Sequence, residues 1–236
     1  VVCTKRESVQ AMNTKGGNKI RIWGIESGRC MRVYWMAEEL GLDYEIVPIT
    51  SRSGQTLSPE FTALNPIQKI PVFEYGPVIL SESAAIITYM ADRFSLPEGF
   101  CGGRTSEIKA KISEWCFFVM TELDAHSLYL IRRHDSLKEV YGEAPEAVAS
   151  AEEYFNKQIT AATKKMDNSG PYVLGRNFSV ADILLSSCLD WAIAYELGIP
   201  DAMLRYREIV HQRHAYQKAL TINYPNGIPN SMLRSK

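Results

Sequence analysis

The spacing of apolar residues divides the chain into a mixed first part and a helical second part. Apolar and polar residues alternate over 19–24, which predicts a β-strand, and apolar residues at helical spacing follow over 30–40. The same reasoning predicts a strand at 44–49, a short helix from Ser58, a hairpin at 70–80 and a helix at about 82–94. The expected order before residue 95 is therefore β-α-β-α-β-β-α.

Beyond a glycine- and proline-rich segment at 95–104, the apolar period is that of helices throughout. Further helices are predicted at 148–166, 180–196 and 200–220. The first long helix carries an apolar stripe that we expect to pack a bundle core. Its members step by three and four residues: Ile108, Ile112, Trp115, Cys116, Val119, Leu123, His126 and Leu130.

These patterns predict a small α/β domain followed by an all-α helical bundle. Residues 1–18 show no period and are expected to form a disordered extension. We place the α/β domain at 19–95, a linker at 96–104, the helical domain at 105–222 and a poorly ordered tail at 223–236.

Composition and charge narrow the classes of function. The chain of 236 residues is 46% hydrophobic and 22% charged, as in ordinary globular proteins. Its 26 basic and 27 acidic residues give a net charge of −1, so we expect no nucleic-acid partner, and no apolar run is long enough for a membrane span. Five cysteines without a C-x-x-C pair favour reduced thiols in the cytoplasm and no metal site.

Two segments at strand ends have the residues for binding an anion. Ser27 stands where the first strand passes into the first helix, and free amides at a helix N-terminus favour anions, including a thiolate. Ser81, Glu82 and Ser83 open the helix after the hairpin in the same way. For both segments, simple helix capping is the alternative.

The segment before the hairpin is a third candidate. Pro71 enters a strand, which removes one ladder donor and leaves neighbouring backbone groups free for a ligand. If the Ile70–Pro71 bond were cis, the amide and carbonyl of Ile70 would face outward at a tight turn. The alternative is a proline on an edge strand.

Four motifs in order make the chain resemble the cytosolic glutathione transferases over residues 19–220. They are SGRCMRV at 27–33 with EELGLDY at 38–44, SPEF at 58–61 with NP at 65–66 and KIP at 69–71, ESAAIITY at 82–89, and FSVAD at 178–182. The resemblance implies a thioredoxin-like N-terminal domain that binds glutathione, a cis Pro71, an all-helical domain lining an electrophile site, and a homodimer. The last motif also has the pattern of an acidic capping box between Ser179 and Asp182.

The same resemblance assigns roles to individual residues. It places the Ser27 hydroxyl at the glutathione sulfur. Tyrosine-type members have a tyrosine phenol near the end of the first strand, where this chain has Trp23. The resemblance therefore indicates a serine-type enzyme of the phi, tau, theta or zeta kind. The remaining implied glutathione contacts are Lys69 at the glycyl carboxylate, Ile70 and Pro71 at the cysteinyl moiety, and Glu82 and Ser83 at the γ-glutamyl end. The candidates for the electrophile site are Trp115, Phe118 and Tyr129, with core packing as the alternative for Trp115.

The resulting hypothesis is a detoxifying transferase, in which glutathione is the co-substrate and its thiolate attacks a small hydrophobic electrophile. Two kinds of alternative stay open. The first is another enzyme: Cys30 could act as the nucleophile of a glutathione-dependent thiol reductase, or the chain could be an isomerase of the same family. The protein could also bind glutathione or another ligand without catalysis.

Overall fold

A computed structural model describes residues 18–234 of the chain. The extension predicted at 1–18 lies outside these residues, apart from its last position.

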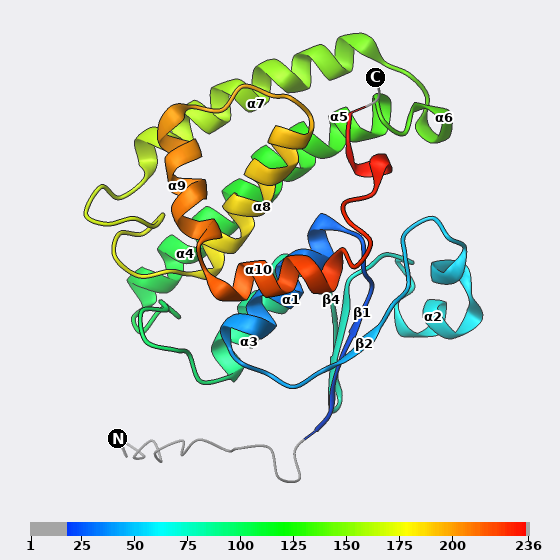
Figure 1. Ribbon diagram of the computed structural model, residues 1–236, viewed down its shortest axis with the longest axis horizontal. Coiled ribbons are helices and arrows are strands. Elements are labelled where there is room, and N and C mark those ends of the chain that lie inside the picture. The colour runs from blue at the N-terminus through cyan, green and yellow to red at the C-terminus, as the bar shows by residue number, and fades with distance from the viewer. Residues whose placement is uncertain (1–17, 235–236) are drawn as a thin grey trace, which may run out of the picture.

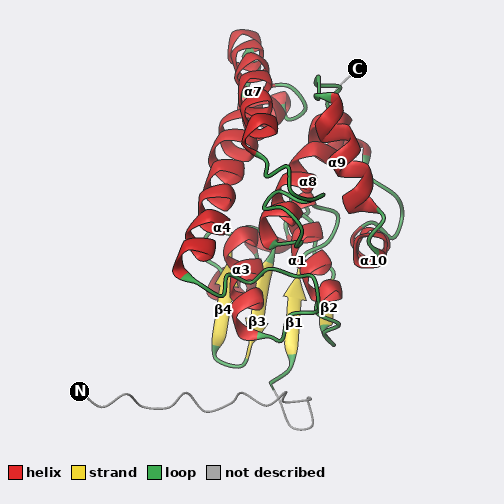
Figure 2. Ribbon diagram, turned by 90° about the vertical axis from the view of Figure 1, so that its left-hand side faces the viewer, coloured by secondary structure: helices red, strands yellow, loops and turns green. Residues whose placement is uncertain are grey.

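The first domain is built on a four-stranded mixed sheet of order β2-β1-β3-β4. Strand β1 pairs parallel with β2 and antiparallel with β3, and β3 pairs antiparallel with β4. Figure 2 shows the four strands side by side, with α1 and α3 next to them. The elements are β1 (Ile20–Trp23), α1 (Gly28–Glu39), β2 (Glu45–Val47), η1 (Gln55–Leu57), α2 (Pro59–Leu64), β3 (Val72–Tyr75), β4 (Val78–Ser81) and α3 (Ser83–Arg93). The predicted thioredoxin-like order is confirmed.

The second domain is helical, as predicted, and packs on α1 and α3 (Figure 1). Its central helix α8 is buried along almost its whole length, and the capping box predicted at Ser179 forms, with the Asp182 carboxylate accepting from the Ser179 amide at 2.8 Å. The elements are α4 (Ser106–Phe118), the π-helix η2 (Val119–Leu128), α5 (Tyr129–His134), α6 (Lys138–Tyr141), α7 (Pro145–Lys165), α8 (Val180–Ala194), α9 (Asp201–His211), α10 (His214–Asn223) and η3 (Asn230–Met232). None of the helices within 18–234 is long and apolar enough to cross a bilayer.

The prediction for His126 is wrong. The long helix turns into a π-helix at Val119, and its wider turn breaks the three-four spacing on which the prediction depended. The His126 side chain is consequently 68% exposed and faces Glu122, whereas Asp124 is turned into the interior.

The C-terminal third differs from expectation in two places. The helix predicted at 200–220 is divided into α9 and α10, and Arg213 between them makes a two-point ion pair with Glu39, with both distances 2.6 Å. The tail, expected to be poorly ordered, instead contacts the helical domain and α1 near its end (red in Figure 1). Arg234 binds Glu152 at 2.6 Å, and the methyl group of Met232 lies 3.9 Å from where a Cβ on Gly28 would be.

Candidate functional site

Ser27 is the N-cap of α1, at the position where the chain leaves β1. Its backbone is extended and its Oγ accepts a hydrogen bond from the Arg29 amide at 3.3 Å. Because that bond uses the oxygen as acceptor, the hydroxyl keeps a proton that it can donate to another group. The side chain is only half-buried, so a ligand can approach it.

The turn before β3 has the geometry predicted from its proline. The Ile70–Pro71 peptide bond is cis. Asn65 secures this turn, since its Nδ2 donates to the Lys69 carbonyl at 2.8 Å. Across 18–234 the Ile70 amide and carbonyl find no hydrogen-bond partner, which leaves both for a ligand. Lys69 itself is exposed.

Gly24 joins the turn before α1 to the cis-proline turn. Its φ is +111°, and a Cβ placed on it would be 2.6 Å from the Ile70 Cβ and 2.8 Å from the Cys30 Sγ. Only glycine allows both this conformation and this approach. The close approach holds the loop between β1 and α1, which we call the Ser27 loop (residues 24–27), against Ile70.

We expect Gly24→Ala to lower the free energy of unfolding by more than about 2 kcal/mol, because left-handed strain and overlap with Ile70 add together. Gly41→Ala is the matched control: its φ is +60° and nothing lies within 4 Å of its Cβ position, so only strain of about 1 kcal/mol applies. Urea unfolding of both variants measures the difference. Equal losses would show that the contact with Ile70 and Cys30 is unimportant.

The N-terminus of α3 lacks the routine capping considered from the sequence. Glu82 is the N-cap with φ +68°, and its side chain makes no capping hydrogen bond. The Ser83 hydroxyl is turned inward, 1% exposed, and accepts from Arg32 at 3.2 Å. The first amides of α3 are therefore available to an anion.

Arg32 is a central residue of the site region that sequence reasoning missed. Its guanidinium is 1% exposed and donates to Ser83, to Ser187 of α8 at 2.6 Å and to Asp124 of η2 at 2.8 Å. It thus ties the start of α3 to two helices of the second domain. The signal in the sequence was a lone arginine inside the apolar stretch of α1, but its partners are far away along the chain.

Comparison with known proteins identifies the family of the chain. The family model described as Glutathione S-transferase, N-terminal domain matches residues 19–92, and the one described as Glutathione S-transferase, C-terminal domain matches 118–210. The chain belongs to the glutathione S-transferase superfamily. These two matches fall in both domains of the chain, and the first includes all the residues predicted to bind glutathione.

Individual relatives differ in what their names report. Glutathione S-transferase theta-1 of Bos taurus is 26% identical over 157 residues, which are 66% of this chain and 65%, just under two thirds, of that protein. Disulfide-bond oxidoreductase YfcG of Escherichia coli is 27% identical over 195 residues, covering 78% of this chain and 86% of that protein. A Lodderomyces elongisporus glutathione transferase homolog, solved with two GSH per subunit, superimposes with a TM-score of 0.76 at 20% identity, over 86% of this chain and 98% of the other.

Asp124 links the Ser27 loop to the helical domain. Its carboxylate is 1% exposed and pairs with Arg29 as well as Arg32. Burial alone would raise the pKa of Asp124, but the positive charges of Arg32 and Arg29 outweigh burial and leave that pKa lowered. Asp124 is therefore ionised and fixes Arg29 beside Ser27.

The three aromatic residues predicted for the electrophile site lie in different places. Tyr129 is half-buried, and the Arg29 guanidinium lies 4.7 Å from the centre of its ring. Trp115 is 2% exposed and packs edge-on against Phe118, with ring centres 5.8 Å apart, in the bundle core. The structure therefore brings only Tyr129 close to the Ser27 loop through Arg29.

Cys30 lies in the first turn of α1 and is fully buried. Burial raises the pKa of its thiol to about 12, although the nearby Ser27 hydroxyl and the charge of Arg29 act in the opposite direction. At pH 7 a thiol with this pKa is ionised in about one molecule in 10⁵. Cys30 is therefore a poor nucleophile.

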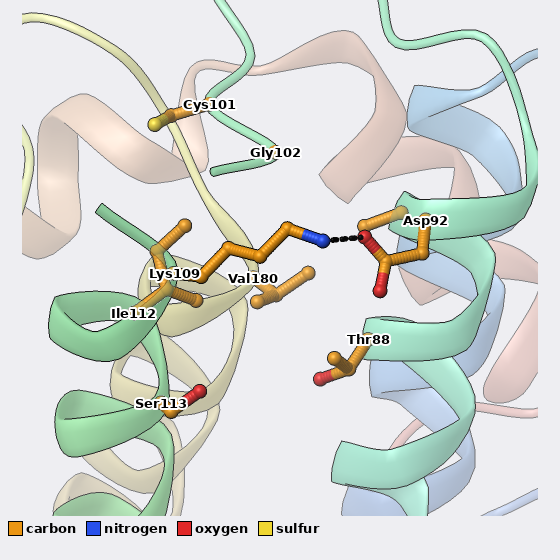
Figure 3. Close-up of a pocket in the computed structure, with 9 residues that line it drawn as sticks. Thr88, Asp92, Cys101, Gly102, Lys109, Ile112, Ser113 and Val180 are labelled. Carbon is orange, nitrogen blue, oxygen red and sulfur yellow. Dashed lines mark hydrogen bonds and ion pairs between the residues drawn. The ribbon is translucent and has the colours of Figure 1, made fainter. Parts of the chain in front are cut away.

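A separate cavity of about 100 Å³ lies between α3 and α4 (Figure 3). The Lys109 ammonium group reaches across it to Asp92 at 3.1 Å, and Cys101 borders it. None of the residues predicted to bind glutathione lines this cavity.

Proposed function

We propose that this chain is a serine-type glutathione transferase, in which Ser27 stabilises the thiolate of glutathione for attack on a small electrophile. The observation that carries the proposal is the half-buried Ser27 hydroxyl at the N-terminus of α1, on a loop that approaches the Ile70–Pro71 turn closely at Gly24. Membership of the superfamily supports glutathione-dependent activity in general.

The energetic demand on Ser27 is modest. A thiol with a pKa near 8.5 is only a few per cent ionised at pH 7, and lowering that pKa by about two units takes about 2.7 kcal/mol. A charge-assisted hydrogen bond supplies roughly 1.5–3 kcal/mol and a helix N-terminus roughly 0.3–1 kcal/mol. Ser27 and the first turn of α1 can together meet this demand, so no general base is required.

The rest of glutathione is proposed to lie along the strand ends. The Ile70 backbone would pair with the cysteinyl part, and Lys69 would face the glycyl carboxylate. The uncapped amides of α3, including that of Ser83, would hold the γ-glutamyl carboxylate at the helix dipole, and Glu82 can pair with the ammonium group.

The direct test combines binding with turnover. The protein should be retained by immobilised glutathione and should conjugate 1-chloro-2,4-dinitrobenzene with glutathione. Retention without turnover of aryl halides, epoxides or isothiocyanates would favour the alternative of a non-catalytic carrier.

A glutathione-dependent reductase is the second candidate, because YfcG is named a disulfide-bond oxidoreductase. If Cys30 were its nucleophile, Cys30→Ala should abolish any reductase activity. We expect instead that Cys30→Ala changes transferase and disulfide-reducing rates by less than about threefold, because the thiol stays protonated. Parallel assays of both reactions measure this, and loss of disulfide reduction alone would reverse the ranking.

Assembly and setting are part of the same proposal. From the superfamily we infer that the protein forms a homodimer and has a detoxifying role in the cytoplasm. An isomerase would be a variant of the same chemistry. Light scattering of the purified protein distinguishes a dimer from a monomer.

A further inference from the structure

Positive charge gathers where α5 and α8 meet the first two turns of α1, next to Ser27. Asp124 is shared by two guanidinium groups, Arg29 and Arg32, so these three residues carry one net positive charge. Arg132 of α5 adds another, since it pairs with no carboxylate in the part of the chain that the structure describes. An unpaired guanidinium that is partly out of water is costly unless a ligand neutralises it.

Two aromatic rings give this positive cluster a flat apolar face. The Trp191 indole lies between the two arginines, with its ring centre 5.5 Å from the Arg29 Cζ and 5.9 Å from the Arg132 Cζ. Tyr129 is one turn before Arg132 on α5 and packs against Arg29. The indole Nε1 of Trp191 is buried and has no acceptor among residues 18–234.

The environment of Arg132 is consistent with an unneutralised cluster. Burial is the largest cause of its lowered pKa. Tyr195 acts in the opposite direction, and the positive charges of Arg52 and Arg29 lower the pKa further. Arg52 lies on the loop between β2 and η1, so a fourth guanidinium lies near the same cluster.

We propose that the electrophile of this enzyme carries an anionic group, such as a carboxylate, which Arg132 binds while Tyr129 and Trp191 pack against its aromatic or unsaturated part. The inference rests on the proposed transferase function. A guanidinium presents a planar fork that matches a carboxylate, and aromatic faces accept a flat apolar group. Glutathione also has carboxylates, but these are proposed to lie at Lys69 and at the start of α3.

The test uses two electrophiles with the same reactive ring, one anionic and one neutral: 4-chloro-3-nitrobenzoate and its methyl ester. With either one, the glutathione sulfur forms a bond to the ring carbon that carries chlorine, chloride leaves with the bonding electron pair, and the thiol proton goes to solvent. Comparing Arg132→Gln with the unaltered protein on both compounds removes their intrinsic difference in reactivity. Arg133→Gln is the matched control, because Arg133 is the next residue, is exposed and lies over Tyr141.

We expect Arg132→Gln to lower kcat/KM for the acid at least tenfold, to change the ester less than threefold and to leave the KM for glutathione unchanged. Arg133→Gln should alter none of these values. Equal losses on acid and ester, or a raised KM for glutathione alone, would overturn the inference. If Arg132→Gln does not fold, the unaltered protein can be used to test the inference. Added salt should then raise the KM of the acid and leave the KM of the ester unchanged. An equal response of the two KM values to salt would contradict the proposal.

The outcomes also separate this inference from the proposed function. If the ester is turned over and Arg132→Gln affects acid and ester equally, the proposed transferase function stands and the inference of an anionic substrate is wrong. Turnover of neither compound overturns both.

Discussion

Ser27→Ala is expected to lower kcat/KM for conjugation of an aryl halide by more than about tenfold, and up to about a hundredfold. The variant removes the only side-chain donor proposed for the thiolate, and a charge-assisted hydrogen bond of roughly 1.5–3 kcal/mol corresponds to that range of rate. Steady-state kinetics at pH 7 with varied glutathione measures the effect. Ser27→Thr keeps the hydroxyl and should retain most of the activity.

A matched control separates chemistry from helix capping. Ser27→Ala also removes a cap, which costs about 1 kcal/mol of stability. Thr105 caps α4 with its Oγ1, which accepts from the Ile108 amide at 3.4 Å, and takes no part in the proposed site. Thr105→Ala should therefore cost similar stability with no loss of kcat/KM. A fall in activity common to both variants would assign the effect to folding and contradict the role of Ser27.

Asp124→Asn is expected to lower the free energy of unfolding by about 3–5 kcal/mol. Without the carboxylate, the fully buried Arg32 loses its counter-ion, and breaking a buried pair by removing one partner costs that much. Thermal or urea unfolding measures the loss. Asp92→Asn is the control, since its pair with Lys109 is exposed and should contribute less than about 1 kcal/mol.

The same network predicts how stability depends on pH. The pKa of Asp124 is lower in the folded protein than its ordinary value of 3.8, so its contribution is fully present above that value and is lost as the pH falls through the folded pKa. Asp124→Asn lacks this contribution at every pH. The stability gap between the two proteins should therefore narrow on acidification below about pH 4; a constant gap would show that Asp124 is not the titrating group.

Local patterns predicted most of the first domain. The alternating strand at 19–24, the hairpin and the helix after Glu82 all form where expected, because period and turn residues act over a few positions. Ser27 as N-cap was also anticipated. These features depend on neighbouring residues, which a single sequence displays. The cis Ile70–Pro71 bond was implied by the resemblance to the family and not by a local pattern.

The interactions between the two domains could not be predicted in the same way. Arg32 and Asp124 are 92 positions apart, and their pairing depends on how η2 packs against α1. The π-helix that exposes His126 and buries Asp124 breaks the helical period of apolar residues, and its sequence contains no proline or glycine that would predict the break. The packed C-terminal segment is likewise held by a distant pair, Arg234 with Glu152.

The pKa of glutathione bound to the protein tests the central claim most directly. The ultraviolet absorbance of the thiolate, titrated in the complex, should give a pKa about two units below that of free glutathione. In Ser27→Ala the value should return most of the way to that of the free tripeptide. A bound thiol that titrates like free glutathione, or a lowered pKa that survives in Ser27→Ala, would contradict the account.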